Sequence, residues 1–429
     1  MMNYKKIFYL IIALPVFIFS QQLDVQKSNE HYKIAVDLFN RKEYSKSIEE
    51  LLAANQFRPN YPRYLYSLAS VYSAAGEKEK AMIVLNKIAS FKIFFDLEKD
   101  SDFVNLFKTD EFKTLTGRLA DNLKPVVKSK PVFSLHEKDL LTEGVAYNPA
   151  TERFYVSSVH KRKIIEVNSR GASRDFIKEG ESGLWGNFGL KVDVPRQILW
   201  VCTSGIEQTR NIKNSEIGKA GLLAYNLKNG SLIRKITLNS TKEDHLMGDL
   251  TISSDGDVYT TDSKTNVIYK LGRNKNKFEE ILRSKDFISL QGIALSGDEK
   301  FLFVSDYSSG VHRFNLKTKE KVVLPYPQDL VVLGIDGLYF YENSLIAIQN
   351  GINPHRLIRL ELNENFSGIE SWRILESNNP LFNEPTLGVI SGNKFFFIAN
   401  SQWESFSPKG EINSPEKLQS PLILLLHLD

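Results

Sequence analysis

The sequence is poor in cysteine and histidine and has no block of one charge. Its only cysteine, Cys202, excludes a disulfide within the chain, and its apolar surroundings predict a buried small hydrophobe. The seven histidines are scattered, so they form no metal-binding pair at helical spacing. We interpret His245, just before the third copy of the repeat described below, as a surface residue. These absences argue against a thiol enzyme and a histidine-based metal site.

Several other function classes are also excluded. The net charge is only +4 over 429 residues and no basic block is present, so we expect no nucleic-acid partner. No glycine-rich phosphate loop or dinucleotide fingerprint occurs. Ser182 lies between glycines but lacks the strand–turn–helix pattern of a lipase nucleophile. With 42% apolar and 25% charged residues, the chain has the composition of a globular protein with a large core.

The N-terminus has the pattern of a secretory signal peptide. Residues 1–6 are basic, residues 7–20 are almost wholly apolar, and a polar stretch begins at Gln21. We expect a signal peptide over residues 1–20 with cleavage near Ser20, a secreted or periplasmic location, and no stable membrane span after cleavage. The alternative is an uncleaved anchor, because Ile18 is large at a position where signal peptidases prefer a small residue.

Residues 24–122 show helical periodicity. Small and apolar residues recur after 34 positions, with Ala35, Ser47 and Leu51 followed by Ala69, Ala81 and Leu85. This spacing resembles the tetratricopeptide repeat and predicts an α-helical, tetratricopeptide-like domain. Such a domain either binds a protein partner in its groove or packs against the second domain, and the sequence leaves both alternatives open. A linker rich in proline and lysine follows at residues 124–131.

Residues 131–429 contain a repeated β pattern. Its six copies begin at Glu143, Phe188, Gly248, Gln291, Asp336 and Glu384, and four of the five intervals are 43 to 48 residues long. A β repeat of this length predicts a mainly β fold, a six-bladed β-propeller. We expect the strand at residues 132–137 to complete the last blade as its outermost strand and to tie the helical domain to the rim of the ring rather than its axis.

Two long insertions fall between second and third strands of their blades, at residues 205–221 and 401–421, and a shorter one falls at residues 350–355. In a propeller these loops share one face with the starts of the first strands. They are predicted to cover the mouth of the channel, although ordinary surface variation is the alternative.

Oxygen-bearing side chains open most of the first strands. Glu143 and Asp336 supply carboxylates and Gln291 supplies an amide, and all point toward the axis in the predicted fold. Converging carboxylates repel each other unless a cation joins them, and an all-oxygen set suits Ca²⁺ or Mg²⁺. A water-filled polar funnel without metal is the alternative.

These axial residues and the repeat resemble the gluconolactonase, regucalcin and paraoxonase superfamily over residues 131–429. The resemblance implies that Glu143, Gln291 and Asp336 bind a divalent metal, expected to be Ca²⁺, and that Asp249 lines the substrate pocket or adds a metal ligand. The expected catalytic residues are Asp336, which would take a proton from water, and Asp249, which would orient the substrate. We expect a metal-dependent hydrolase of a small lactone or ester.

Three positions depart from the pattern of that superfamily. Gln291 stands where asparagine is expected, Gly248 replaces a residue that is often asparagine, and Phe188 stands where paraoxonase-like members place a histidine. The alternative function is therefore a non-catalytic scaffold of the cell envelope that binds proteins through its helical domain.

Overall fold

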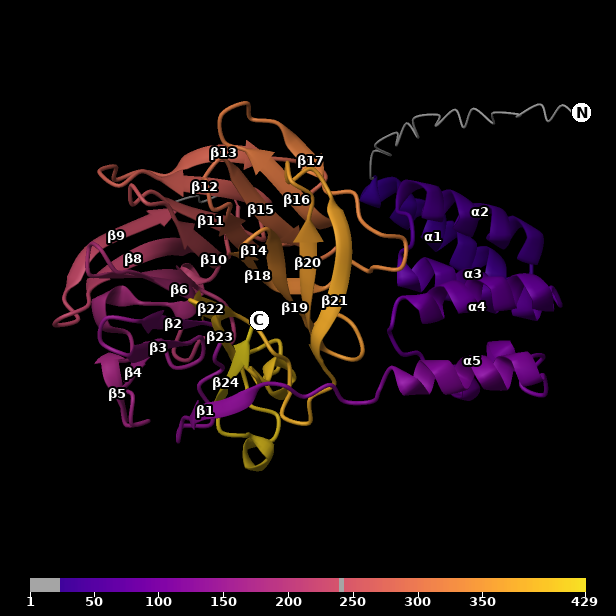
Figure 1. Cartoon of the computed structure of the whole chain (residues 1–429), viewed down its shortest axis with the longest axis horizontal. Coiled ribbons are helices and arrows are strands. Elements are labelled where there is room, and N and C mark those ends of the chain that lie inside the picture. Colours follow the sequence, from indigo (N-terminus) through magenta and orange to yellow (C-terminus); the bar gives the residue numbers. More distant parts are fainter. Residues whose placement is uncertain (1–23, 239–242) are drawn as a thin grey trace, which may run out of the picture.

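The computed structural model describes residues 24–238 and 243–429, so the expected signal peptide lies outside the described residues. Five α-helices are followed by a ring of six four-stranded antiparallel sheets in this part of the chain. Figure 1 shows the helices at one side of the ring, next to the sheet that contains β20 and β21. None of the described helices is long and apolar enough to span a membrane.

The helical segment consists of antiparallel pairs. Its helices are α1 (Val25–Asn40), α2 (Tyr44–Phe57), α3 (Pro62–Ala74), α4 (Lys78–Ser90) and α5 (Asp110–Asp121), with the short 3₁₀ turns η1 (Leu97–Lys99) and η2 (Ser101–Phe103) before α5. The small residues of the repeat are buried, with Ala69 and Ala81 both 0% exposed, which lets the helices approach closely. The likeness to tetratricopeptide repeats stays a prediction.

Each blade is a sheet of four strands, given below in order from the axis outward. The numbers rise outward in the first five blades, and β1 is the outermost strand of the sixth. The first three blades contain β2 (Val145–Asn148), β3 (Arg153–Ser158), β4 (Lys163–Val167) and β5 (Ser173–Ile177); β6 (Gly186–Asp193), β7 (Ile198–Ser204), β8 (Ala220–Asn226) and β9 (Leu232–Leu238); and β10 (Met247–Ile252), β11 (Val258–Asp262), β12 (Val267–Leu271) and β13 (Glu279–Arg283).

The remaining blades contain β14 (Leu290–Leu295), β15 (Phe301–Asp306), β16 (Gly310–Asn315) and β17 (Lys321–Val323); β18 (Ile335–Tyr341), β19 (Ser344–Gln349), β20 (Arg356–Leu362) and β21 (Ile369–Ser377); and β22 (Gly388–Ser391), β23 (Lys394–Ile398), β24 (Leu422–His427) and β1 (Lys130–Ser134). Short 3₁₀ turns lie in the connections at η3 (Glu181–Gly183), η4 (Asn214–Glu216), η5 (Trp403–Ser405) and η6 (Pro415–Lys417).

The sixth blade closes the ring as predicted. Strand β1, from the start of the propeller, pairs antiparallel with β24 from the end of the chain, with Phe133 opposite Ile423. The ends of the propeller are thereby joined through backbone hydrogen bonds, and β24 has a partner on both sides.

Glycines bring the first strands together around the axis. A Cβ added to Gly144 would lie 2.6 Å from the Phe188 carbonyl oxygen, and one added to Gly292 would lie 2.6 Å from the Asp336 carbonyl oxygen. A side chain would therefore push neighbouring blades apart. The same relation links Gly337 to the carbonyl oxygen of Thr386, at 3.2 Å. Thr386 is therefore the ring position of the sixth blade, and Glu384 stands two residues before it.

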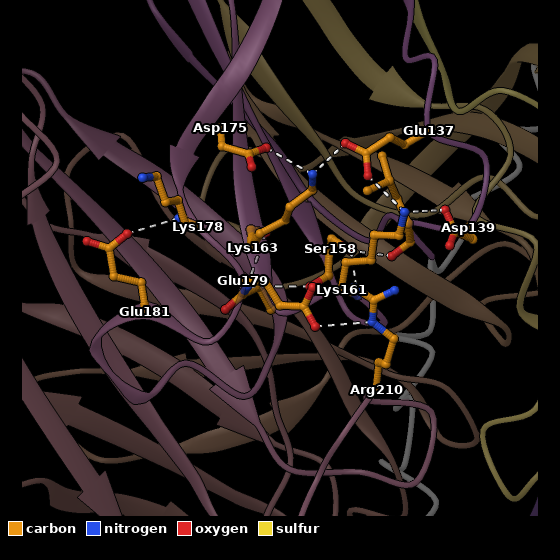
Figure 2. A network of polar contacts seen from close by, with 12 residues as sticks. Glu137, Asp139, Ser158, Lys161, Lys163, Asp175, Lys178, Glu179, Glu181 and Arg210 are labelled. Atoms are coloured by element: carbon orange, nitrogen blue, oxygen red, sulfur yellow. Dashed lines mark hydrogen bonds and ion pairs between the residues drawn. The ribbon is translucent and has the colours of Figure 1, made fainter.

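Charged side chains fix the entry to the first blade (Figure 2). Lys161 Nζ lies 2.8 Å from Glu137 Oε2 and 2.6 Å from Asp139 Oδ1, while Lys163 pairs with Glu137 and Asp175. Figure 2 also shows Arg210, which belongs to the loop at 205–221 and pairs with Glu179. This loop is therefore held against the first blade by an ion pair.

The helical segment reaches farther over the propeller than predicted. Attachment through β1 lies at the outer edge of the last blade, but the helices also pack on loops of the fourth and fifth blades. Phe94 N–H donates to the Asn353 carbonyl oxygen at 2.7 Å. The buried Arg356 guanidinium donates to the carbonyl oxygens of Phe91 and Lys92, at 3.1 and 3.2 Å. The attachment through β1 at the rim agrees with the prediction, and the contacts with loops on the face where the channel opens are additional to it.

Candidate active site

A cavity of about 250 Å³ lies where the first strands converge. Residues from all six blades line it, namely Glu143, Phe188, Leu246, Gly248, Asp249, Ser263, Gln291, Asp336, Glu384, Leu387 and Trp403. Four of these are carboxylic acids, and within the described chain none of the lining residues is lysine, arginine or histidine. The sequence-predicted residues Glu143, Asp249, Gln291 and Asp336 all belong to this wall.

The carboxyl group of Glu143 is 9% exposed. Its Oε2 accepts hydrogen bonds from Trp403 Nε1 at 2.9 Å and from Ser401 Oγ at 3.3 Å. Burial raises the pKa of Glu143 well above its ordinary value, the nearby charges of Asp336 and Glu384 add to the rise, and the two hydrogen bonds oppose it. Glu143 is therefore a carboxyl group that an added cation would strongly stabilise in its charged form.

Asp336 is held from behind by an amide. Asn350 Nδ2 donates to Asp336 Oδ2 at 2.9 Å and to the Pro385 carbonyl oxygen at 3.0 Å, while Asn350 Oδ1 accepts from Tyr307 Oη at 3.0 Å. These three bonds fix the orientation of the amide. Burial raises the pKa of Asp336 to about 7. The Asn350 hydrogen bond opposes this rise, and the charge of Glu384 adds to it.

Gln291 completes the predicted ligand set. Its Nε2 donates to Ser289 Oγ at 3.0 Å. Its Oε1 lies 3.9 Å from the place that a Cβ would occupy on Gly248, which is itself a cavity residue. The extra methylene relative to asparagine therefore does not remove the amide oxygen from the cavity wall.

Glu384, which opens the sixth copy of the repeat, also lines the cavity, although we predicted no ligand or catalytic role for it from the sequence. Its backbone is left-handed, with φ of +63°, and its Oε2 accepts from the Trp403 backbone N–H at 2.9 Å. Burial raises its pKa to about 7, and the backbone hydrogen bond opposes this rise. We call Glu143, Asp336 and Glu384 together the mouth layer.

A second polar group lies farther along the first strands and is here called the inner layer: Asp249, Lys191 and Tyr339. Lys191 Nζ lies 3.9 Å from Asp249 Oδ1, 4.9 Å from the centre of the Tyr339 ring and 3.2 Å from the Gly388 carbonyl oxygen that accepts its hydrogen bond. Tyr339 Oη accepts from Gly388 N–H at 2.6 Å. The inner layer therefore contains its own ammonium group.

Asp249 is 1% exposed, and its Oδ1 accepts from the Leu250 N–H at 2.8 Å. Its Oδ2 is buried without a hydrogen-bond partner among the described residues. Burial raises the pKa of Asp249, and the charge of Lys191 opposes that rise. An unpaired buried carboxyl oxygen in a cavity wall is a group that a ligand would satisfy.

Aromatic rings form one wall of the cavity. Phe188 is 3% exposed, and its ring stacks on that of Trp403 with centroids 6.3 Å apart and planes 24° apart. Trp403 comes from the loop at 401–421, whose Ser407 carbonyl oxygen accepts from Gln208 Nε2 of the loop at 205–221, at 3.2 Å. The two long loops thus contact each other and place one indole ring in the cavity, in agreement with the predicted covering role.

The third predicted loop, at 350–355, contributes Asn350 behind Asp336. The sequence offered only the position of this loop as a signal for Asn350. Lys191 lies three residues after Phe188, and Tyr339 lies three residues after Asp336. Because Phe188 and Asp336 open equivalent copies of the repeat, the sequence could have predicted that Lys191 and Tyr339 share a layer.

Two isolated side chains behave differently from one another. Cys202 is buried as predicted, and burial raises its thiol pKa. His245 is 4% exposed, so its assignment to the surface is wrong. Its Nδ1 pairs with Asp262 Oδ2 at 2.6 Å, because the loop before the third blade folds down onto the end of β11. Neither side chain lines the cavity.

The donor set fits a hard cation in its chemistry. All predicted ligands offer oxygen. The charges of Asp336 and Glu384 raise the pKa of Glu143, and the charge of Glu384 raises the pKa of Asp336. No described basic side chain lines the cavity beside them. No cluster of three or more His, Cys, Asp or Glu residues suited to holding a metal is found in the part of the chain that the structure describes. The predicted set has only two such residues plus an amide, so metal binding and the Ca²⁺ assignment stay predictions.

No protein-family model matches the sequence, and no curated protein matches it either. The chain is similar to solved propellers. A gluconolactonase from Xanthomonas campestris has 13% identity and a TM-score of 0.47, with 67% of this chain and 85% of that chain covered. The aldose sugar dehydrogenase from Streptomyces coelicolor in its PQQ-bound form has 14% identity and a TM-score of 0.48, with 71% and 98% covered. Virginiamycin B lyase from Staphylococcus aureus has 15% identity and a TM-score of 0.46, with 70% and 99% covered.

Proposed function

We propose that this propeller hydrolyses a small lactone or ester with the help of a divalent cation, for which Ca²⁺ is the leading candidate. The observation that carries the proposal is a set of four carboxyl groups, three buried and one half-buried, that line one cavity and leave the mouth layer without a positive charge among the described residues. Glu143, Gln291 and Asp336 would hold the cation. When bound, it would supply a positive charge that polarises the scissile carbonyl group.

Asp336 would act as the proton acceptor. Its carboxyl group lies in the cavity wall, where it would take a proton from water and return it to a leaving oxygen. Asn350 occupies Asp336 Oδ2, so the proton would reside on Oδ1.

Asp249 would orient the substrate. Its Oδ2 would accept a hydrogen bond from a substrate hydroxyl group, which would satisfy a buried acceptor that has no hydrogen-bond partner among residues 24–238 and 243–429. The Lys191 ammonium group beside Oδ1 favours the charged, accepting form of this carboxyl group.

The apolar part of the wall would limit access of bulk water. Phe188, Leu246, Leu387 and Trp403 surround the carboxyl groups in a cavity of about 250 Å³, which is at the small end for ligand pockets. The substrate is therefore expected to be compact, such as a monocyclic lactone.

The test is a hydrolysis assay on a panel of lactones and aryl esters with the full chain, in calcium and in excess EDTA. We expect hydrolysis that EDTA abolishes and calcium restores. Asp336→Asn should lower kcat at least about a hundredfold, the usual scale for a lost general base. Glu416→Gln, an exposed change in the loop at 401–421, is the matched control. An active enzyme in EDTA would contradict the metal requirement, and inactivity on the whole panel would contradict the proposed class.

One observation favours the scaffold alternative. Large apolar side chains are exposed on the helical segment, including Ile83 at 69% and Val104 at 58%. If no substrate is turned over, protein binding by this surface becomes the leading function.

A further inference from the structure

The inner layer shows how this channel binds an ammonium group. Lys191 Nζ is surrounded by the face of an aromatic ring, a carboxylate oxygen and a backbone carbonyl oxygen, from Tyr339, Asp249 and Gly388 respectively. An aromatic face together with a carboxylate is a favourable environment for an organic cation, because the ring quadrupole and the negative charge both attract it.

The cavity above presents the same two kinds of group without a cation. The stacked rings of Phe188 and Trp403 form one wall, and Glu384 is held beside Trp403 by the hydrogen bond from its backbone N–H. Asp249, which is paired with Lys191, lines the same cavity. Glu384 does not belong to the predicted metal set and has no basic partner among the cavity residues of the described chain, so its carboxyl group remains for a second positive group.

We propose that the wall formed by Phe188, Trp403 and Glu384 is a subsite for a substituted ammonium group, so that the substrate is a cationic lactone or ester. This inference rests on the proposed function for the reacting carbonyl group and adds the charge class of the substrate. Glu384 supplies the negative charge, and the rings of Phe188 and Trp403 supply the faces that contact the methyl or methylene groups around the nitrogen.

The charge of the wall supports this choice over an anionic ligand. Four carboxyl groups and no basic side chain line the cavity within the described chain, so a carboxylate or phosphate would meet repulsion.

The test compares choline with its neutral isostere 3,3-dimethylbutan-1-ol by calorimetry on the full chain. The two probes have the same shape and differ in charge. We expect choline to bind at least about tenfold more tightly, the ratio that a partly desolvated cation–π and carboxylate contact supplies. Equal affinities, tighter binding of the alcohol, or no binding of choline would overturn the proposal.

Two variants test whether the preference for choline arises from the wall formed by Phe188, Trp403 and Glu384. Glu384→Gln and Trp403→Leu should each reduce the choline preference at least about threefold and leave the weak affinity for the alcohol unchanged. Glu416→Gln should keep the full preference, and thermal unfolding of each variant verifies folding. A preference that persists in both wall variants would place the cation elsewhere and overturn the proposal.

Titrations in EDTA and in calcium separate the two proposals. A choline preference in both conditions without any hydrolysis would support the subsite and contradict the hydrolase. Hydrolysis of neutral lactones without a choline preference would support the hydrolase and contradict the subsite.

Discussion

The inner layer of the channel has a carboxyl group with an ammonium group beside it, whereas the mouth layer has three carboxyl groups and no basic partner among the described residues. Glu143, Asp336, Asp249 and Tyr339 are buried, whereas Glu384 and Lys191 are half-buried. Both layers arise near the starts of the first strands. In the inner layer the chain compensates its own charge through Lys191. In the mouth layer compensation must come from protons or from a bound cation, and this is why we propose that this layer binds the cation.

The largest expected effect comes from removing the cation of the inner layer. Lys191→Met leaves Asp249 buried beside no positive charge and should lower the free energy of unfolding at pH 7 by about 3 kcal/mol. Urea unfolding measures this loss. The double variant Lys191→Met/Asp249→Asn should recover most of it, because the unpaired charge is gone. A double variant no more stable than the single one would show that Lys191 does not act through Asp249.

An opposite result is expected when a mouth-layer charge is removed. The folded-state pKa of Asp336, about 7, lies above its ordinary value of 3.8. Below about pH 4 the group is protonated in both states and has no effect; as pH rises toward 7 the unfolded state ionises first and stability is lost.

Asp336→Asn in EDTA should therefore stabilise the protein by about 1–3 kcal/mol at pH 8 and by little at pH 4. Urea unfolding at the two pH values measures the difference. Equal destabilisation at both pH values would mean that Asp336 is well compensated and that the two layers do not differ.

The smallest effect concerns the amide behind the mouth layer. Asn350→Leu removes a hydrogen bond to the charged form of Asp336 and should raise the Asp336 pKa, at a cost of about 1 kcal/mol at pH 8. The expected readout is a shift of the pH dependence of stability, or of kcat, toward higher pH. Tyr307→Phe removes only the hydrogen bond to Asn350 Oδ1. This variant should shift the pH profile in the same direction but by less. An unchanged pH profile would deny Asn350 a positioning role.

The repeat in the sequence was enough to predict the ring and the meeting of Glu143, Gln291 and Asp336. Glycines such as Gly144 and Gly292 mark where backbones converge, so the residue before each one has a fixed place. The same argument failed by two residues in the sixth blade, where it took Glu384 instead of Thr386 as the ring position. The reason is that Thr386 is followed by Leu387, so the glycine that marks this position in other copies is absent.

Contacts made by loops were not predictable in this way. The bond from Trp403 to Glu143 joins residues 260 positions apart and depends on how a long loop folds. The docking of helices on the fifth blade through Arg356, and the burial of His245 against Asp262, are likewise contacts between segments with no common period. Only the three-dimensional arrangement shows them.

The most direct test of the contrast between the layers is a calorimetric titration of the metal-free full chain with calcium and with magnesium. The account predicts one divalent cation per chain, with a rise in thermal stability, and loss of both effects in Glu143→Gln/Asp336→Asn. Glu416→Gln should bind as the wild type does. Absence of divalent binding, or binding that the double variant retains, would contradict the claim that the mouth layer holds the metal.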